Sequence, residues 1–175
     1  MKIHDKEFVK YISKEEIADR ISVMAGSINA DYQGKNPLFI SILNGSFMVA
    51  ADLFREIDLE SEISFVKVTS YQDMESTGDV KKLIGLNEPI YDRDVIFVED
   101  IVDSGRTIQK MASEFKSLGA KSVEVATLLI KPESLIVDLD VKYIGFEIPP
   151  LFVVGYGLDY NGLGRNLKDI YQLKP

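Results

Sequence analysis

The segment Val95–Thr107, with the sequence VIFVEDIVDSGRT, constrains the fold more than any other part of the chain. Its first four residues are apolar and predict a buried strand, and apolar residues at helical spacing begin at Ile108. Between them stand two acids and a turn of small residues that includes Gly105. A strand, a tight turn and a helix in this order form the repeating unit of a sheet flanked by helices. The segment therefore predicts an α/β fold.

The rest of the chain continues this alternation of strands and helices. Ser13 and Glu16 have the spacing of a capping box, and apolar residues at helical intervals follow as far as Ile28. Strands are predicted at 38–43, 63–69, 95–98, 123–130, 143–146 and 152–155, and helices at about 14–33, 47–54 and 108–118. Since no repeat or linker interrupts the pattern, it predicts one domain over residues 1–175, with a parallel central sheet flanked by helices.

Composition and charge narrow the class of protein. The chain has 20 basic and 28 acidic residues, and its net charge of −8 argues against a nonspecific grip on nucleic acid. The absence of cysteine excludes disulfides and thiolate metal sites, and the single histidine, His4, has no ligand cluster around it. Neither a signal peptide nor an apolar run of about 18 residues is visible, so we expect a cytoplasmic enzyme without a membrane span.

The turn at residues 103–107 has the chemistry of a phosphate site. The N-terminus of a helix presents free backbone N–H groups, and Gly105 permits close approach of a ligand. The hydroxyls of Ser104 and Thr107 can add donors. Glu99 and Asp100 would repel a phosphate, so we expect them to bind sugar hydroxyls or a divalent cation. Together these groups predict a site for a phosphorylated sugar.

The same turn has other interpretations, as a helix cap or as a phosphate site of another class. Asp103 or Ser104 can cap a helix without any ligand, which is the usual role of these residue types at a bare helix start. The turn lacks the Gly-Lys-Ser/Thr ending of a Walker A loop and the Gly-x-Gly-x-x-Gly of a dinucleotide site. A phosphoacceptor signalling domain also places adjacent acids after a buried strand, but it has no need of a Ser/Gly/Thr phosphate loop.

With its two acids, two apolar residues and Asp-Ser-Gly-Arg-Thr, the segment resembles the ribose-diphosphate motif of the phosphoribosyltransferases. The resemblance is strongest to the hypoxanthine(-guanine) enzymes, and it continues through Ser70-Tyr71, Ser76-Thr77-Gly78-Asp79, Leu129-Ile130-Lys131, Phe146-Glu147-Ile148-Pro149 and on to Arg165. It implies the type I phosphoribosyltransferase fold with a small hood formed by the terminal segments. It also implies a magnesium-dependent transfer, in purine salvage, from phosphoribosyl diphosphate to hypoxanthine or guanine, by a homodimer or homotetramer.

The resemblance assigns a role to each residue of the sugar and base site. The 5-phosphate would lie on Asp103, Ser104, Gly105, Arg106 and Thr107, and the carboxyl of Asp103 would exchange a proton with the purine imidazole. Lys131 would donate to a 6-oxo group, Phe152 would stack on the base, and Val153 would offer backbone groups to its edge. Without the resemblance, Lys131 would be interpreted as a solvated surface residue and Phe152 as core.

Diphosphate and metal would be held by other segments. The resemblance implies that Asp159 binds Mg²⁺, with Glu99 and Asp100 as further acids of the metal and sugar site, and that Arg165 binds diphosphate. Residues 70–82 would form a mobile loop that closes over the site and brings Ser70 and Tyr71 to the diphosphate.

The pattern departs from the family at the other diphosphate contact. Asn44-Gly45 stands where the family commonly has Lys or Arg before the glycine, often with a cis peptide, so a positive charge is missing here. Gly162 and Gly164 replace larger residues before Arg165, which predicts a less firmly held arginine. These departures leave an alternative open, a regulatory protein of the same fold that binds nucleotides or RNA without turnover.

Overall fold

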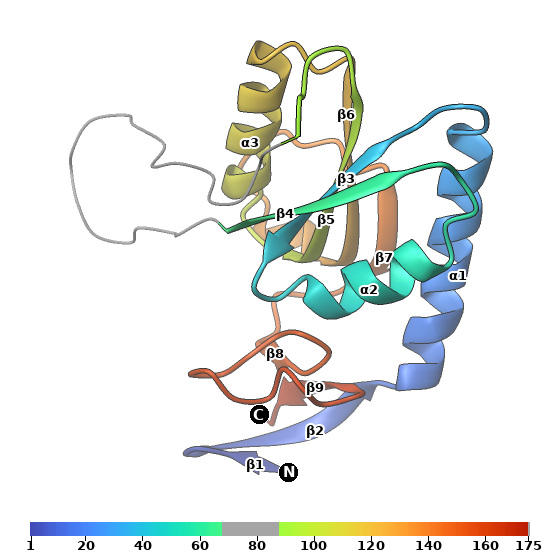
Figure 1. Ribbon diagram of the computed structural model, residues 1–175. Coiled ribbons are helices and arrows are strands. Elements are labelled where there is room, and N and C mark those ends of the chain that lie inside the picture. The colour runs from blue at the N-terminus through green and yellow to red at the C-terminus, as the bar shows by residue number, and fades with distance from the viewer. Residues whose placement is uncertain (68–87, 175) are drawn as a thin grey trace.

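A five-stranded parallel sheet forms the centre of the computed structural model, which describes residues 1–67 and 88–174 (Figure 1). Its strand order is β4-β3-β5-β6-β7, and each neighbouring pair is parallel. The strands are β3 (Leu38–Leu43), β4 (Glu62–Lys67), β5 (Asp94–Val102), β6 (Ser122–Ile130) and β7 (Tyr143–Glu147). The predicted α/β fold with a parallel central sheet is therefore confirmed.

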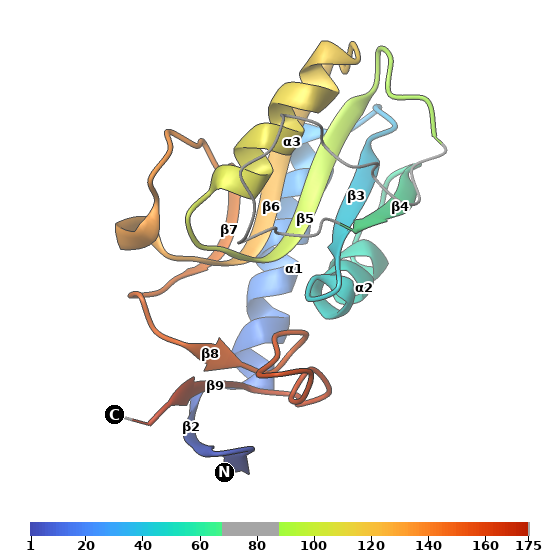
Figure 2. The same cartoon turned by 90° about the vertical axis from the view of Figure 1, so that its left-hand side faces the viewer.

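Helices cover both faces of this sheet because its strands are apolar on both sides. Helices α1 (Lys14–Asp31) and α2 (Phe47–Arg55) pack on one face, and α3 (Arg106–Ser117) packs on the other (Figure 2). Within β5, Ile96 and Val98 belong to the core under α1 and α2, while Val95 and Phe97 belong to the core under α3. The continuous apolar run that predicted a buried strand is thus shared between two cores.

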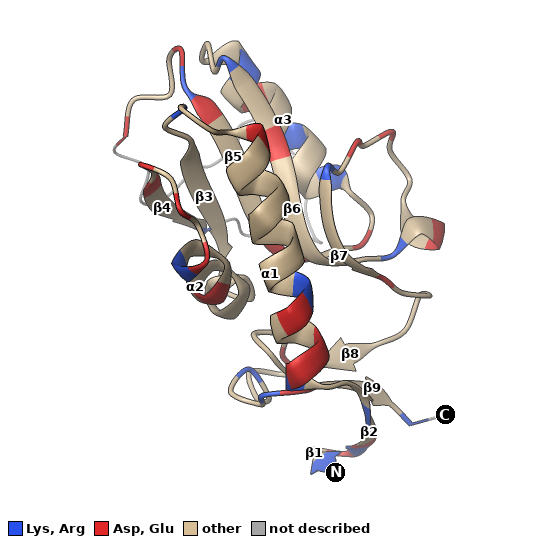
Figure 3. Cartoon of the chain, turned by 90° about the vertical axis from the view of Figure 1, so that its right-hand side faces the viewer, with Lys and Arg blue, Asp and Glu red and all other residues tan. Residues whose placement is uncertain are grey.

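The predicted capping box begins α1. The Ser13 side chain accepts from the backbone N–H of Glu16, and the Glu16 carboxylate accepts from the backbone N–H of Ser13 at 2.9 Å. Glu15 and Glu16 lie in the first turn, where negative charge is favoured by the helix dipole, and Figure 3 shows this acidic end of α1 close to the hood. Ile17, Ile21 and Ile28 are buried against the sheet as the helical spacing predicted.

A second, antiparallel sheet forms a hood below the carboxyl ends of the central strands (Figures 1 and 2). Its order is β1-β2-β9-β8, with β1 (Lys2–Ile3), β2 (Lys6–Ile12), β8 (Val153–Val154) and β9 (Ile170–Leu173). The two ends of the chain meet here, since Phe8 of β2 pairs with Leu173 of β9. The hood of terminal segments is confirmed, although β1, β2 and β9 were not predicted as strands from their sequence.

The element bounds differ from the prediction in places that concern the site. Strand β5 continues to Val102, so Glu99 and Asp100 lie inside the strand instead of after it. Arg106 and Thr107 lie in the first turn of α3 instead of the preceding loop. Ser70, Tyr71 and the rest of the predicted loop 70–82 lie outside the described residues. Among the helices that the structure describes, none is long and apolar enough to cross a membrane.

Candidate active site

Strands β5 and β6 bring Asp103 and Lys131 together. The two strands are parallel and Val102 is in register with Ile130, so the next residue of each leaves the sheet at the same place. The Lys131 ammonium lies 2.7 Å from Oδ2 of Asp103, and its side chain is only 12% exposed. The interpretation of Lys131 as an ordinary solvated lysine is therefore wrong, because the lysine is shielded and paired with the carboxylate predicted to exchange a proton.

The phosphate turn is shaped by Gly105 at the start of α3. Gly105 has a φ of +78°, and a Cβ at this position would lie 2.8 Å from Cγ2 of Val137. No side chain caps the helix, which excludes the role of Asp103 or Ser104 as a simple cap. The backbone of Ser104 is instead braced by the N–H of Ile136, which donates to its carbonyl at 3.2 Å. The helix start can therefore offer backbone donors to an anion.

Glu99 and Asp100 form a buried acidic pair at the end of β5. Burial raises the pKa of Glu99 well above its ordinary value, and the neighbouring Asp100 charge raises it further. Burial also raises the pKa of Asp100, opposed by the backbone N–H of Ile101, which donates to Oδ1 at 3.0 Å. Two adjacent carboxylates in one buried place cannot both ionise without cost, so the pair suits a cation or a hydrogen-bond donor.

Three segments far apart in the sequence meet at Gly45, between β3 and α2. A Cβ on Gly45 would lie 1.6 Å from Oδ2 of Asp100, and a Cβ on Gly157 would lie 2.0 Å from the carbonyl oxygen of Gly45. Only glycine fits at both positions, because each contact is with a neighbouring backbone or carboxylate. The turn predicted for diphosphate thus lies against the acidic pair on one side and the hood on the other.

Arg165 is fixed beside this contact. Its guanidinium donates to the carbonyl of Gly157 at 2.7 Å and lies 2.6 Å from Oδ1 of Asp159. The other carboxylate oxygen of Asp159 accepts from the backbone N–H of Gly162 at 2.7 Å. Arg165 also lowers the pKa of Asp100, although burial of that carboxyl is the larger effect. Arg165 therefore has two partners among the described residues, and its being less firmly held than in relatives stays a prediction.

Asn44 is exposed at the same turn, and the peptide bond before it, Leu43–Asn44, is cis. The cis bond thus precedes Asn44, whereas the sequence had left open a cis bond between Asn44 and Gly45. The hydroxyl of Ser46 is buried and donates to the carbonyl of Ile42 at 2.5 Å. Asn44 is thus the exposed residue of the turn, whereas Gly45 and Ser46 are buried.

The predicted base-stacking residue lies in the hood. The Phe152 side chain is 43% exposed, which contradicts its interpretation as a core residue, whereas Val153 in β8 is buried at 6%. The ring of Phe152 packs edge-on against Tyr160 with centroids 5.6 Å apart, and the Lys6 ammonium lies 5.5 Å from its centroid. An exposed ring fixed by aromatic neighbours can offer one face to a planar ligand.

Comparisons with known proteins agree with this arrangement. The family model described as "phosphoribosyl transferase domain" matches residues 10–161. A hypoxanthine-guanine phosphoribosyltransferase of Streptococcus agalactiae is 44% identical over 163 residues, covering 93% of this chain and 91% of its own length. The Bacillus subtilis protein of the same name is 40% identical, covering 98% of this chain and 96% of its own. The chain belongs to the phosphoribosyltransferase family.

A solved structure places it more closely within the family. The crystal structure of a hypoxanthine-guanine phosphoribosyltransferase from Bacillus anthracis superposes with a TM-score of 0.89 at 38% identity, covering 97% of this chain and 99% of that one. The fold is therefore the type I phosphoribosyltransferase fold, and the chain is a transferase of the hypoxanthine-guanine group.

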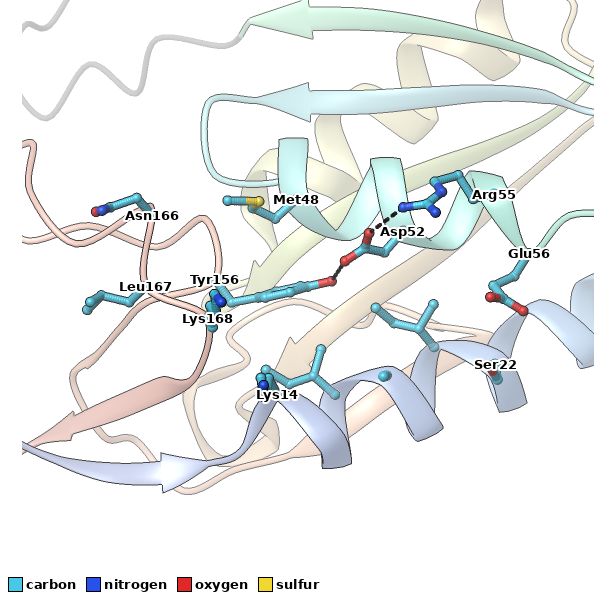
Figure 4. A pocket seen from close by; sticks show the side chains of 13 residues that line it. Lys14, Ser22, Met48, Asp52, Arg55, Glu56, Tyr156, Asn166, Leu167 and Lys168 are labelled. Atoms are coloured by element: carbon cyan, nitrogen blue, oxygen red, sulfur yellow. Dashed lines mark hydrogen bonds and ion pairs between the residues drawn. The ribbon is translucent and has the colours of Figure 1, made fainter.

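One cavity of this phosphoribosyltransferase lies away from these residues. It measures about 420 Å³ between α1, α2 and residues 166–168, and none of the predicted site residues lines it. In it the Tyr156 hydroxyl donates to Asp52 of α2, which also lies 3.9 Å from Arg55 (Figure 4). Burial and this hydrogen bond raise the pKa of Tyr156, so the phenol stays neutral. The bond fixes the residue next to Gly157 and so helps to hold the hood against the turn.

Sequence reasoning missed both Gly157 and Tyr156. The sequence Gly155-Tyr156-Gly157 does carry a signal, since all three residues have positive φ, two of them as glycines that relieve strain. Which backbone Gly157 would approach was not visible, because Gly45 lies more than half the chain away. No group of three or more potential metal ligands occurs among the residues that the structure describes, so Glu99, Asp100 and Asp159 form no complete metal site by themselves.

The contact between Gly157 and Gly45 predicts a position-specific effect of adding a methyl group. Gly157→Ala should lower the free energy of unfolding by about 1–2 kcal/mol for the left-handed backbone, and by a further ~1–3 kcal/mol for overpacking. Gly162→Ala is the matched control, because its φ is +84° but nothing lies within 4 Å of the added Cβ. Urea unfolding of both variants measures the difference. Equal losses would contradict the close contact.

The raised pKa of Glu99 predicts a dependence of stability on pH. The folded state holds the proton more tightly than the unfolded state, so the free energy of unfolding falls as pH rises from about 4.5 towards the folded pKa. Glu99→Gln should remove this part of the decline, whereas Glu133→Gln at an exposed position should leave it. Urea unfolding between pH 5 and about 8 with a chelator present measures both. Parallel curves for wild type and Glu99→Gln would refute the shift.

Proposed function

We propose that this chain transfers the 5-phosphoribosyl group from phosphoribosyl diphosphate to hypoxanthine or guanine, giving the nucleoside monophosphate and diphosphate. The observation that carries the proposal is the 2.7 Å pair of Asp103 and Lys131 beside the phosphate turn. It places a carboxylate able to exchange a proton next to a cation able to recognise an oxo group. The names of the relatives, hypoxanthine-guanine phosphoribosyltransferases, support the same substrates.

Each residue of the site has a role in the proposed reaction. A purine ring nitrogen forms a bond to C1′ of ribose as the bond from C1′ to diphosphate breaks, and the purine loses a proton. Asp103 would exchange a proton at the imidazole ring, and Lys131 would donate to the 6-oxo oxygen. Phe152 would stack on the base, and the backbone of Val153 would meet its edge. A 6-amino group would present hydrogens to the Lys131 ammonium, so adenine would be disfavoured.

The sugar phosphate and the diphosphate would occupy opposite sides of the site. Ser104, Gly105, Arg106 and Thr107 at the uncapped start of α3 would hold the 5-phosphate. Arg165 and the turn Asn44-Gly45 would hold the diphosphate, with Ser70 and Tyr71 as further predicted contacts. Neutral Asn44 would make the turn rely on backbone donors, while Arg165 supplies the positive charge.

Magnesium is part of the proposal, and the residues present fit it. Mg²⁺ is commonly held by one or two carboxylates together with phosphate oxygens of the substrate. Asp159 and the pair Glu99 and Asp100 supply such carboxylates, and since burial raises the pKa of both members of the pair, a cation beside them would favour their ionised forms. The ion would neutralise the charge that develops on the departing diphosphate.

The alternative of a regulatory protein that binds nucleotides or RNA without turnover is not favoured. The relatives are named as enzymes at high coverage. Figure 3 shows Lys and Arg interspersed with Asp and Glu on the face that it presents, where an RNA-binding stripe would gather basic residues. The homodimer or homotetramer, the cytoplasmic location and the single domain with a mobile loop remain predictions.

Turnover with purified protein tests the proposal. With Mg²⁺ and phosphoribosyl diphosphate, we expect monophosphate from hypoxanthine and guanine and little from adenine, measured by chromatography of the products. Xanthine in the same series tests the choice among 6-oxopurines. If no 6-oxopurine yields a monophosphate, the proposed function is wrong, and a gel shift with RNA at moderate salt would then test the regulatory alternative.

Asp103 has its own prediction. Asp103→Asn keeps the size and a hydrogen-bonding oxygen but cannot take a proton, so kcat should fall by about 100-fold or more while binding of phosphoribosyl diphosphate changes little. Glu133→Gln, the same chemical change in the exposed 3₁₀ helix Pro132–Ser134, is the control. Steady-state kinetics with hypoxanthine measure both variants. A wild-type kcat in Asp103→Asn would exclude the proton-transfer role.

A further inference from the structure

The N-terminal hairpin contacts the loop that carries Asp159 and Arg165. The Tyr160 hydroxyl donates to Oδ1 of Asp5 at 2.7 Å. Nε2 of His4 lies 3.3 Å from the carbonyl oxygen of Asn161, and the His4 and Tyr160 rings pack edge to face. These contacts join the turn between β1 and β2 to the middle of the loop 159–165.

Packing adds a further contact between the two segments. A Cβ on Gly164 would lie 3.3 Å from Cδ1 of Ile3 and 2.4 Å from Cγ2 of Val154, so the backbone at Gly164 sits directly on the hood sheet. The hairpin therefore touches the loop immediately before Arg165 as well as immediately after Asp159. Its contacts enclose the stretch between the two charged residues.

The loop needs external support because its backbone is unusual. Asn161 has a φ of +49° and Gly162 a φ of +84°, in a tight turn in which the N–H of Tyr160 donates to the carbonyl of Leu163 at 2.9 Å. On one side the loop is held by Arg165 through Gly157 to the turn at Gly45. On the other side the hairpin holds it through Asp5. Movement of the loop would therefore shift Asp159 and Arg165 together.

We propose that Asp5 and Tyr160 are positioning residues that set the place of Asp159 and Arg165, and so tune binding at the diphosphate end of the site. The proposal rests on the proposed function for the roles of Asp159 and Arg165. Neither Asp5 nor Tyr160 needs to touch the substrate. A loop displaced by about 1 Å is enough to weaken contacts that depend on geometry.

The exposure of Asp5 and Tyr160 distinguishes a positioning role of their hydrogen bond from a role in global stability. Asp5 is exposed and Tyr160 is only half-buried, so their hydrogen bond contributes little to global stability. The Tyr160 ring, by contrast, packs against Phe8 and Phe152 with centroids 6.1 Å and 5.6 Å away. Removing the hydroxyl alone therefore tests the hydrogen bond and leaves the ring packing of the base end intact.

Tyr160→Phe and Asp5→Ala test the proposal, with Asp5→Asn as the conservative variant that keeps an acceptor oxygen. Two quantities are measured for each protein: KM and kcat with phosphoribosyl diphosphate and with hypoxanthine, and Kd for magnesium diphosphate by calorimetry. In Tyr160→Phe and Asp5→Ala, KM for phosphoribosyl diphosphate and Kd for magnesium diphosphate should rise about three- to tenfold, the scale of one ordinary hydrogen bond. KM for hypoxanthine should stay within about twofold, and Asp5→Asn should recover most of the loss.

The outcomes are distinct. Unchanged KM and Kd in both variants would overturn the proposal, and so would a fall in kcat with a lower Tm and unchanged KM, since that is the behaviour of a merely structural contact. The double variant should match the single variants, because both remove the same bond. If the wild type forms no monophosphate, the proposed function fails, and the diphosphate Kd values still decide whether Asp5 and Tyr160 position the loop.

Discussion

The active site depends on one close backbone contact, at the turn that contains Gly45. The Asp100 carboxylate lies against the α-carbon of Gly45, and Gly157 of the hood lies against the carbonyl of the same residue. Neither approach leaves room for a side chain, so two sheets and a loop are brought to a fixed separation by the absence of Cβ atoms. Arg165 then binds the carbonyl of Gly157, and Asp159 binds Arg165. The positions of Arg165 and Asp159, the charged groups proposed to bind diphosphate and magnesium, therefore depend on this contact.

Local sequence patterns were enough to predict the central sheet and its helices. The capping box of Ser13 and Glu16 begins α1, and the apolar runs at 38–43 and 123–130 became β3 and β6 within one residue. The hood was different. Its strands β1, β2 and β9 are mixed in polarity, and β2 pairs with β9, which is distant in the sequence. These strands are stabilised by pairing between residues far apart in the sequence. The local hydrophobic pattern therefore does not predict them.

The same distinction applies to the site. The segment from Glu99 to Thr107 was visible because strand, acids, turn and helix are contiguous. Lys131 was assigned to the site only through the family resemblance, because its local sequence is that of a surface lysine, and the register of β5 and β6 places it beside Asp103. The position of the acids inside β5 was not predicted either, because the apolar run ends at Val98 while the hydrogen-bonded ladder does not. The contact of Gly157 with Gly45 could be recognised only from the folded structure.

The pairing of β2 with β9 also sets an order of events during synthesis. Strand β2 is synthesised well before its partner β9, because the whole central sheet lies between them in the sequence. The central sheet can form before β2 pairs with β9, because the contacts within the central sheet join residues that are closer in the sequence. The hood, with Phe152 and the loop that carries Arg165, can form only after β9 has been synthesised. The turn at Gly105 can therefore form before the hood does, and the residues of the candidate site come together only when strands on both sides of the central sheet in sequence have paired.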